Sequence, residues 1–195
     1  MTDSNTCIGI VLAGGLSSRM GSDKALLERD GQSQLQHSID LLTAAGCDRV
    51  IVSRNAPGYI EDQYSNAGPL AGIHAAIATE PDALRYLIIP VDMPKLPVEA
   101  LQQLLQQEAH CTLEQGPLPC VINNQSDLTR MLADNIKAGE LRIRRWLKQL
   151  NAESLSIEDA DWLTNTNTPA EWQRATQSLH SQPSPQGGSH GTPCR

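Results

Sequence analysis

Short apolar runs alternate with segments whose apolar residues recur every three or four positions, a pattern typical of alternating strands and helices. The runs at residues 8–12, 49–53 and 86–90 predict strands, because Ile, Val and Leu dominate them. Helical spacing follows in three places: through Leu35, Ile39 and Leu42 up to a stop at Gly46, through Leu70, Ile73 and Ile77, and over residues 98–107. This order predicts an α/β protein, a three-layer α/β/α arrangement with a mostly parallel, Rossmann-like sheet.

The rest of the chain gives weaker patterns. Residues 120–122 predict a short strand, and the proline-containing residues before them predict a loop. Thr168, Pro169 and Glu171 form a capping box that predicts a helix start. We expect one domain over residues 1–178. The Pro-, Ser- and Gly-rich residues 179–195 predict a disordered tail, because they cannot bury enough apolar surface.

The first strand runs into a loop of glycines, small hydroxyl residues, one arginine and one lysine, LAGGLSSRMGSDK. Gly14 and Gly15 let the backbone approach a phosphate without a Cβ in the way, and Arg19 and Lys24 can neutralise its charge. The adjacent glycines exclude the GxGxxG pattern, and the five residues between Gly15 and Gly21 exclude a Walker A motif. The alternative is a hairpin turn with two solvated basic residues, which predicts no second site elsewhere.

Asp92 lies just beyond the end of the strand at residues 86–90. In open α/β sheets ligands bind beyond the carboxyl ends of the strands, so Asp92 and the glycine loop should lie on the same edge. Hard cations such as Mg²⁺ prefer carboxylate oxygens, and Asp92 is therefore the predicted metal ligand. The alternative is a structural aspartate in a turn between two prolines.

Two further segments have both a functional and a structural interpretation. Residues 68–72, GPLAG, predict a helix start whose free N–H groups favour an anion or a base edge, although packing alone explains the glycines equally well. His74 on this helix is more typical of a core or surface histidine than of a catalyst. Residues 54–67 predict a loop that could fold over a ligand.

A helix over residues 141–150 would bury one face and expose a basic one. Its predicted buried residues are Ile143, Trp146, Leu147 and Leu150, and its exposed residues are Arg142, Arg144, Arg145 and Lys148. The basic face is either simply solvated or a patch for a second, phosphorylated substrate.

Composition narrows the class of protein. The 195 residues suffice for one α/β core, and a formal net charge of −7 argues against a general nucleic-acid binder. No apolar run is long enough for a membrane span and no secretory leader opens the sequence, so we expect a cytoplasmic protein without a membrane partner. The five cysteines lack CxxC spacing, which favours incidental or buried thiols over a disulfide framework or a zinc site.

Four motifs together resemble a known family. They are Leu12-Ala13-Gly14-Gly15 with Arg19-Met20-Gly21 and Lys24, then GPLAG at residues 68–72, PVDMP at residues 90–94, and NTNTP at residues 165–169. Their order resembles the nucleotidyltransferases of glycosyltransferase-A-like fold and, within that group, the molybdenum cofactor guanylyltransferases. The resemblance covers about residues 7–177.

The resemblance implies transfer of GMP from GTP to the terminal phosphate of molybdenum-carrying molybdopterin, with Mg²⁺ as cofactor. It implies Arg19, Lys24 and Asp92 as catalytic residues and Asp92 as the metal ligand. Its implied GTP contacts are Leu12, Ala13, Gly14, Gly15, Lys24, Ser53, Asp62, Gly68 and Asp92. Asn165 and Asn167 would belong to the pterin pocket. We expect a monomer, with molybdoenzyme apoproteins or other cofactor-biosynthesis proteins as partners.

One departure leaves base selectivity open. Family members often carry an asparagine at the end of the second strand. This chain has Ser53 at that position, and its nearest asparagine is Asn55, two residues later. A cytidylyltransferase or a sugar-phosphate nucleotidyltransferase is therefore an alternative within the same fold. From another class, the alternative is a noncatalytic GTP-binding module that delivers cofactor to apoenzymes. The presence of both Lys24 and Asp92 argues against the noncatalytic module, and pyrophosphate release from GTP with molybdopterin would separate the two.

Overall fold

The computed structural model describes residues 6–14, 25, 28–29 and 31–157 of the chain. The elements in chain order are β1 (Cys7–Leu12), β2 (Glu28–Arg29), β3 (Gln32–Ser33), α1 (Gln34–Ala45), β4 (Arg49–Ser53), α2 (Pro69–Thr79), β5 (Arg85–Pro90), α3 (Val98–Leu105), β6 (Cys111–Leu113), β7 (Gly116–Asn123), α4 (Leu128–Lys137), α5 (Ile143–Gln149) and β8 (Glu153–Leu155). Among these described elements, no helix has the length and apolar character needed to cross a membrane.

Six strands form one sheet in the order β4-β1-β5-β7-β6-β8, and β2 and β3 form a separate antiparallel pair. β1 pairs in parallel with both β4 and β5. β7 is antiparallel to both of its neighbours, β5 and β6, and β6 pairs in parallel with β8. All strands of this sheet except β7 therefore run in one direction, which confirms the predicted mostly parallel sheet.

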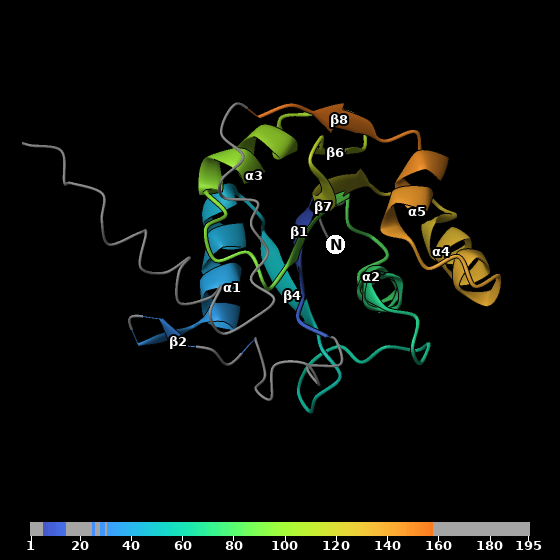
Figure 1. The fold of residues 1–195 in the computed structure, drawn as a ribbon, viewed down its shortest axis with the longest axis horizontal. Coiled ribbons are helices and arrows are strands. Elements are labelled where there is room, and N and C mark those ends of the chain that lie inside the picture. Colours follow the sequence, from blue (N-terminus) through green and yellow to red (C-terminus); the bar gives the residue numbers. More distant parts are fainter. Residues whose placement is uncertain (1–5, 15–24, 26–27, 30, 158–195) are drawn as a thin grey trace, which may run out of the picture.

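Helices cover both faces of the sheet, which confirms the three-layer prediction (Figure 1). α1 and α3 lie on one face, and α2, α4 and α5 lie on the other. Side chains of β5 alternate between the two cores: Tyr86 and Ile88 pack on the α2 side, and Leu87 and Ile89 pack on the α1 side. This alternation follows from the two-residue period of a strand, so a continuous apolar run marks a strand that is buried on both faces.

The ends of α1 follow local rules. The Gln36 N–H donates to Ser33 Oγ at 3.1 Å, which satisfies one of the free donors at the helix start. Gly46 ends the helix in the left-handed conformation, with φ 113°, and its N–H donates to the Leu42 and Thr43 carbonyls. The predicted stop at Gly46 is confirmed.

The prediction of a loop before residue 120 is wrong, because β7 begins at Gly116 and contains Pro117 and Pro119. The pairing of β5 with β7 ends where Ile88 meets Cys120, and within residues 116–119 the register with β6 pairs only Gly116, with Leu113. Proline lacks a backbone N–H and is tolerated where a strand is paired on one side only. The ladder between β6 and β7 also shifts register between Thr112 and Leu113.

Candidate functional site

Three neighbouring strands end level at one edge of the sheet. Leu12 at the end of β1 is in register with Ser53 at the end of β4 and with Pro90 at the end of β5. Two backbone hydrogen bonds continue this alignment: the Ala13 N–H donates to the Ser53 carbonyl at 2.9 Å, and the Val91 N–H donates to the Leu12 carbonyl at 3.0 Å. The segments that follow these strands therefore leave the sheet together, at the edge where open α/β sheets bind ligands.

Gly14 and Asp92 lie just beyond these strand ends. Gly14 is exposed and Asp92 is half-buried. The structure thus brings the start of the glycine loop and the predicted metal carboxylate to one edge, as the sequence predicts. Five other predicted site residues lie outside the described part of the chain: Gly15, Arg19, Lys24, Asn165 and Asn167.

Ser53 lies beneath the first turns of α2. Its side chain is 2% exposed, and a Cβ placed on Gly72 would lie 2.4 Å from Ser53 Oγ and 3.3 Å from Leu12 Cδ2. Gly72 therefore lets α2 approach the ends of β1 and β4 closely. Of the two explanations of the GPLAG segment, ligand binding and packing, the packing explanation applies to Gly72.

Replacing Gly72 by alanine is expected to lower the free energy of unfolding by about 1–3 kcal/mol, the usual cost of overpacking a close contact. Urea unfolding measures this change. The matched variant Ser53→Ala removes the oxygen that the new Cβ would meet, so the double variant should be less destabilised than the sum of the single variants. Strictly additive costs would contradict a direct clash between positions 53 and 72.

Gly68 at the start of α2 has a different requirement. Its φ of 60° and ψ of −150° lie in a region that only glycine adopts readily. A Cβ at this position would meet no atom within 4 Å, so the constraint is the backbone conformation alone. Pro69 follows as the first helical residue, where its missing N–H costs no hydrogen bond. Gly68 thus fixes the angle at which the loop after β4 enters α2.

Asp62 is held by Asn55 across the loop that follows β4. The Asn55 Nδ2–H donates to Asp62 Oδ2 at 2.9 Å, and the Asp62 backbone N–H donates to Asn55 Oδ1 at 2.8 Å. Between them, Ile60 forms an isolated bridge with Ser53, which ties the loop back to the end of β4. The sequence pattern does not predict the pairing of Asn55 with Asp62, because no periodicity relates residues within an irregular segment.

His74 lies in the middle of α2 and packs against the loop that follows β4. It is 7% exposed and packs edge-to-face against Tyr64, with ring centroids 5.0 Å apart. Burial lowers the pKa of His74, and the nearby charge of Lys137 acts in the same direction. This environment favours the neutral ring and agrees with the interpretation of His74 as a core histidine.

α5 has the predicted buried and exposed faces. The buried residues are Ile143, Trp146 and Leu147 of the helix and Leu150, which directly follows it. The exposed basic residues are Arg142, which directly precedes the helix, and Arg144, Arg145 and Lys148 of the helix. One of these charges is compensated locally, because Arg142 donates from Nε and Nη2 to both carboxylate oxygens of Glu140, at 2.7 and 2.6 Å. This hydrogen-bonded partner lowers the pKa of Glu140.

The antiparallel direction of β7 decides where the basic residues lie. Arg144 Nη2–H donates to the Gln115 carbonyl at 3.3 Å, directly before β7 begins at Gly116. Since β7 runs opposite to β5, its first residues lie at the edge of the sheet where β5 ends. The start of α5 therefore faces the same edge of the sheet as Asp92.

The metal-ligating side chains at this edge can be compared with the ligands that Mg²⁺ prefers. Within the described ranges, no three His, Cys, Asp or Glu side chains form a group that could hold a metal ion. Mg²⁺ is usually held by one or two carboxylates together with substrate phosphate oxygens and water. Asp92, half-buried at the edge, fits an ion whose remaining ligands come from a bound nucleotide.

Solved structures define the class of fold. A nucleotidyl transferase from Methanothermobacter aligns with a TM-score of 0.72 at 16% identity, covering 91% of this chain and 100% of that one. A molybdopterin-guanine dinucleotide biosynthesis protein A from Archaeoglobus fulgidus aligns with a TM-score of 0.70 at 20% identity, covering 90% of this chain and 100% of that one. The fold is that of the nucleotidyltransferases.

Sequence relatives narrow the class to a family. Residues 9–154 match the MobA-like NTP transferase domain. A molybdenum cofactor guanylyltransferase from Xanthomonas euvesicatoria is 35% identical over 191 residues, covering 94% of this chain and 100% of the relative. One from Yersinia pestis is 32% identical over 180 residues, covering 84% of this chain and 91% of the relative. The chain belongs to the MobA-like NTP transferase family and is a nucleotidyltransferase.

Proposed function

We propose that this nucleotidyltransferase works in the cytoplasm and transfers GMP from GTP to the terminal phosphate of molybdenum-carrying molybdopterin. The products are molybdopterin guanine dinucleotide and pyrophosphate. The observation that carries the proposal is the shared edge at which β1, β4 and β5 end in register, because it brings Ala13, Gly14 and Asp92 together. The choice of substrates is supported by relatives named molybdenum cofactor guanylyltransferase.

In the proposed reaction a terminal phosphate oxygen of the pterin attacks the α-phosphorus of GTP in line. A new P–O bond forms, and the bond from the α-phosphorus to the α,β-bridging oxygen breaks, which releases pyrophosphate. The attacking phosphate is already ionised near neutral pH, so no protein base is needed. The protein therefore contributes mainly positioning and charge neutralisation.

We assign the nucleotide contacts by motif and position. Leu12, Ala13 and Gly14 line the guanine and ribose side, and Gly15 with Arg19 and Lys24 binds the phosphates and stabilises the leaving pyrophosphate. Asp62 and Gly68 contact the nucleotide from the loop after β4. Because Ser53 is buried beneath α2, we assign it an indirect role: its carbonyl holds the Ala13 N–H and so orients the start of the glycine loop.

Asp92 is the proposed ligand of Mg²⁺. When bound, this ion would offset the negative charge that develops on the phosphates. Asp92 would hold the ion through its carboxylate, and we assign it no other protein ligand.

The pterin substrate would bind at the same edge of the sheet as the nucleotide. Asn165 and Asn167 are its proposed contacts by motif. Arg144 and Arg145 at the start of α5 are exposed near the same edge, so they are suited to a phosphorylated substrate. Arg142 is less suited, because Glu140 already occupies its guanidinium group.

The direct test compares GTP, CTP, ATP and UTP in two measurements. Titration calorimetry measures the binding of each nucleotide in the presence of Mg²⁺, and a pyrophosphate assay measures turnover of each nucleotide with molybdenum-loaded molybdopterin. We expect the tightest binding and release with GTP, and no release when the pterin is omitted. Release with CTP in place of GTP would instead identify a cytidylyltransferase. Binding of GTP without release in the complete mixture would identify a noncatalytic module.

Loss of the Asn55 side chain is expected to weaken GTP binding through Asp62. The Asn55→Ala variant removes the donor to Asp62 Oδ2 and the acceptor for its N–H, each worth roughly 0.5–1.5 kcal/mol. We expect KM for GTP to rise about tenfold while kcat changes little, as measured by pyrophosphate release. Asp62→Ala should have an equal or larger effect on KM, and adding Asn55→Ala to it should cost little more. Independent, additive effects would contradict an action of Asn55 through Asp62.

A further inference from the structure

Two cysteines meet at the edge of the sheet opposite the nucleotide site. Cys7 begins β1, and Cys47 follows Gly46 at the end of α1. Their Sγ atoms are 3.9 Å apart and share a hydrogen bond, although the residues are 40 positions apart in sequence. The pair therefore exists only in the folded chain.

The backbone holds the two thiols at this separation. The Asp48 N–H donates to the Cys7 carbonyl at 2.9 Å, and the Cys7 N–H donates to Asp48 Oδ2 at 2.7 Å. Gly9 provides room for the sulfur, because a Cβ at this position would lie 3.2 Å from Cys47 Sγ. Both sulfurs therefore lie on the α1 face of the sheet in a fixed arrangement.

The two thiols differ in access and in acidity. Cys7 is half-buried, whereas Cys47 is 6% exposed. The hydrogen bond between the two thiols lowers the pKa of Cys7, and Arg85 acts in the same direction. The same hydrogen bond raises the pKa of Cys47, and burial raises it further. Cys7 is thus the more acidic and the more accessible thiol of the pair, and the one that a reagent reaches first.

The other described cysteines lack these properties. Cys111 and Cys120 are both buried, and burial raises the pKa of each thiol. They are suited to packing in the core and make good controls.

We propose that Cys7 and Cys47 form a reversible dithiol site that reacts with small organic disulfides such as oxidised glutathione. The Cys7 thiolate attacks one sulfur of the reagent, forms a mixed disulfide and releases one glutathione thiolate. Cys47 then loses its proton to solvent and attacks Cys7 Sγ, which closes the Cys7–Cys47 disulfide and releases the second thiolate. Two protein thiols are oxidised, and one glutathione disulfide is reduced to two glutathione molecules.

The position of the pair determines its effect. A Cys7–Cys47 bond would close a loop that contains β1, the glycine loop and α1, and so would restrict the unfolded chain over the whole first βα unit. It would lie at the start of β1, whereas the nucleotide site lies at the end of that strand. We expect oxidation to raise the melting temperature by several degrees and to leave pyrophosphate release at moderate temperature unchanged.

The test equilibrates the full-length protein in buffers with graded ratios of reduced to oxidised glutathione. Free thiols are then alkylated, and the unreduced protein is digested and mapped by mass spectrometry. We expect a peptide pair that joins Cys7 to Cys47, which disappears on reduction and whose amount follows the melting temperature. Because this arm uses the parent protein, it does not depend on the folding of any variant.

Two variants test the order of steps. Cys47→Ser should accumulate one glutathione on Cys7, because no second thiol resolves the mixed disulfide, and Cys7→Ser should leave Cys47 unmodified. The matched control Cys111→Ser should behave as the parent does. Stable glutathionylation of Cys7 in the parent, or a disulfide from Cys7 to Cys194 in place of Cys47, would overturn the proposal.

Discussion

Replacing Asp92 by asparagine is expected to lower turnover by about 10²–10³-fold, the usual effect of removing one group that stabilises developing charge in a transition state. The substitution keeps the shape of the side chain and removes the charge that we assign to Mg²⁺ binding. Asp92 lies two residues beyond Pro90, which ends β5 in register with Leu12, so its loss should act on the phosphates rather than on the core. Steady-state pyrophosphate release at saturating GTP measures the effect.

The metal should be tested separately from activity. Electron paramagnetic resonance measures the binding of Mn²⁺ in the presence of a nonhydrolysable GTP analogue, and we expect this binding to be weaker in Asp92→Asn. Raising the Mg²⁺ concentration should restore turnover of this variant only in part. Asp82→Asn is the matched control, because Asp82 precedes the other end of β5 and is exposed. Near-parent transfer by a folded Asp92→Asn protein at low millimolar Mg²⁺ would move the metal site elsewhere.

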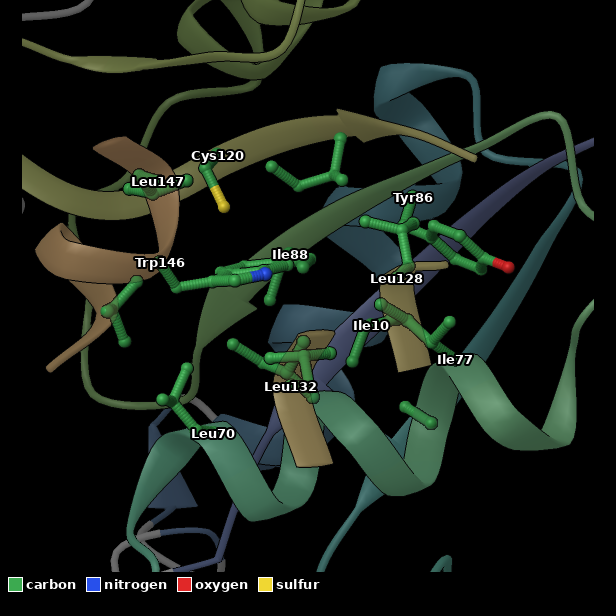
Figure 2. Packing of buried hydrophobic residues seen from close by; sticks show 14 of the residues in the cluster. Ile10, Leu70, Ile77, Tyr86, Ile88, Cys120, Leu128, Leu132, Trp146 and Leu147 are labelled. Atoms are coloured by element: carbon green, nitrogen blue, oxygen red, sulfur yellow. The ribbon is translucent and has the colours of Figure 1, made fainter. Parts of the chain in front are cut away.

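Replacing Trp146 by alanine is expected to lower the free energy of unfolding by about 3–5 kcal/mol, the usual cost of truncating a buried aromatic residue. Trp146 is fully buried, and its indole ring lies among Leu70, Ile88 and Leu132 in the core between α2, α4, α5 and the sheet (Figure 2). Since a domain of this kind is stable by roughly 5–15 kcal/mol, the loss would be a large part of the total. Urea unfolding followed by circular dichroism measures it.

Two controls separate burial from other causes. Trp146→Phe keeps most of the apolar area and should cost less than the alanine variant, because no acceptor for the indole N–H exists within the described residues. Lys148→Ala changes an exposed residue of the same helix and should alter stability by less than about 0.5 kcal/mol. A small effect of Trp146→Ala would show that α5 contributes little to the core.

The sequence by itself determined the elements whose residues are marked by local periodicity. The apolar runs identified β1, β4 and β5 as strands, of which β1 and β5 are buried along most of their length and β4, at the edge of the sheet, is mostly half-buried. The spacing of Ile143, Trp146 and Leu147 identified the buried side of α5. The order of strands and helices was enough to predict the shared edge, because parallel strands joined by helices end on the same side of the sheet. Asp92 and the glycine loop could therefore be assigned to one site before any contact was known.

Only the tertiary structure decided contacts that depend on register and chain direction. The prolines of β7 are compatible with a strand only because β5 does not pair with residues 116–119, and the antiparallel direction of β7 brings Arg144 to the edge where β5 ends. The contacts of Gly72 with Ser53, of Asn55 with Asp62 and of Cys7 with Cys47 join residues that no periodic pattern relates. Periodicity records which face of an element is buried, whereas the partner that buries it is fixed only when the elements pack.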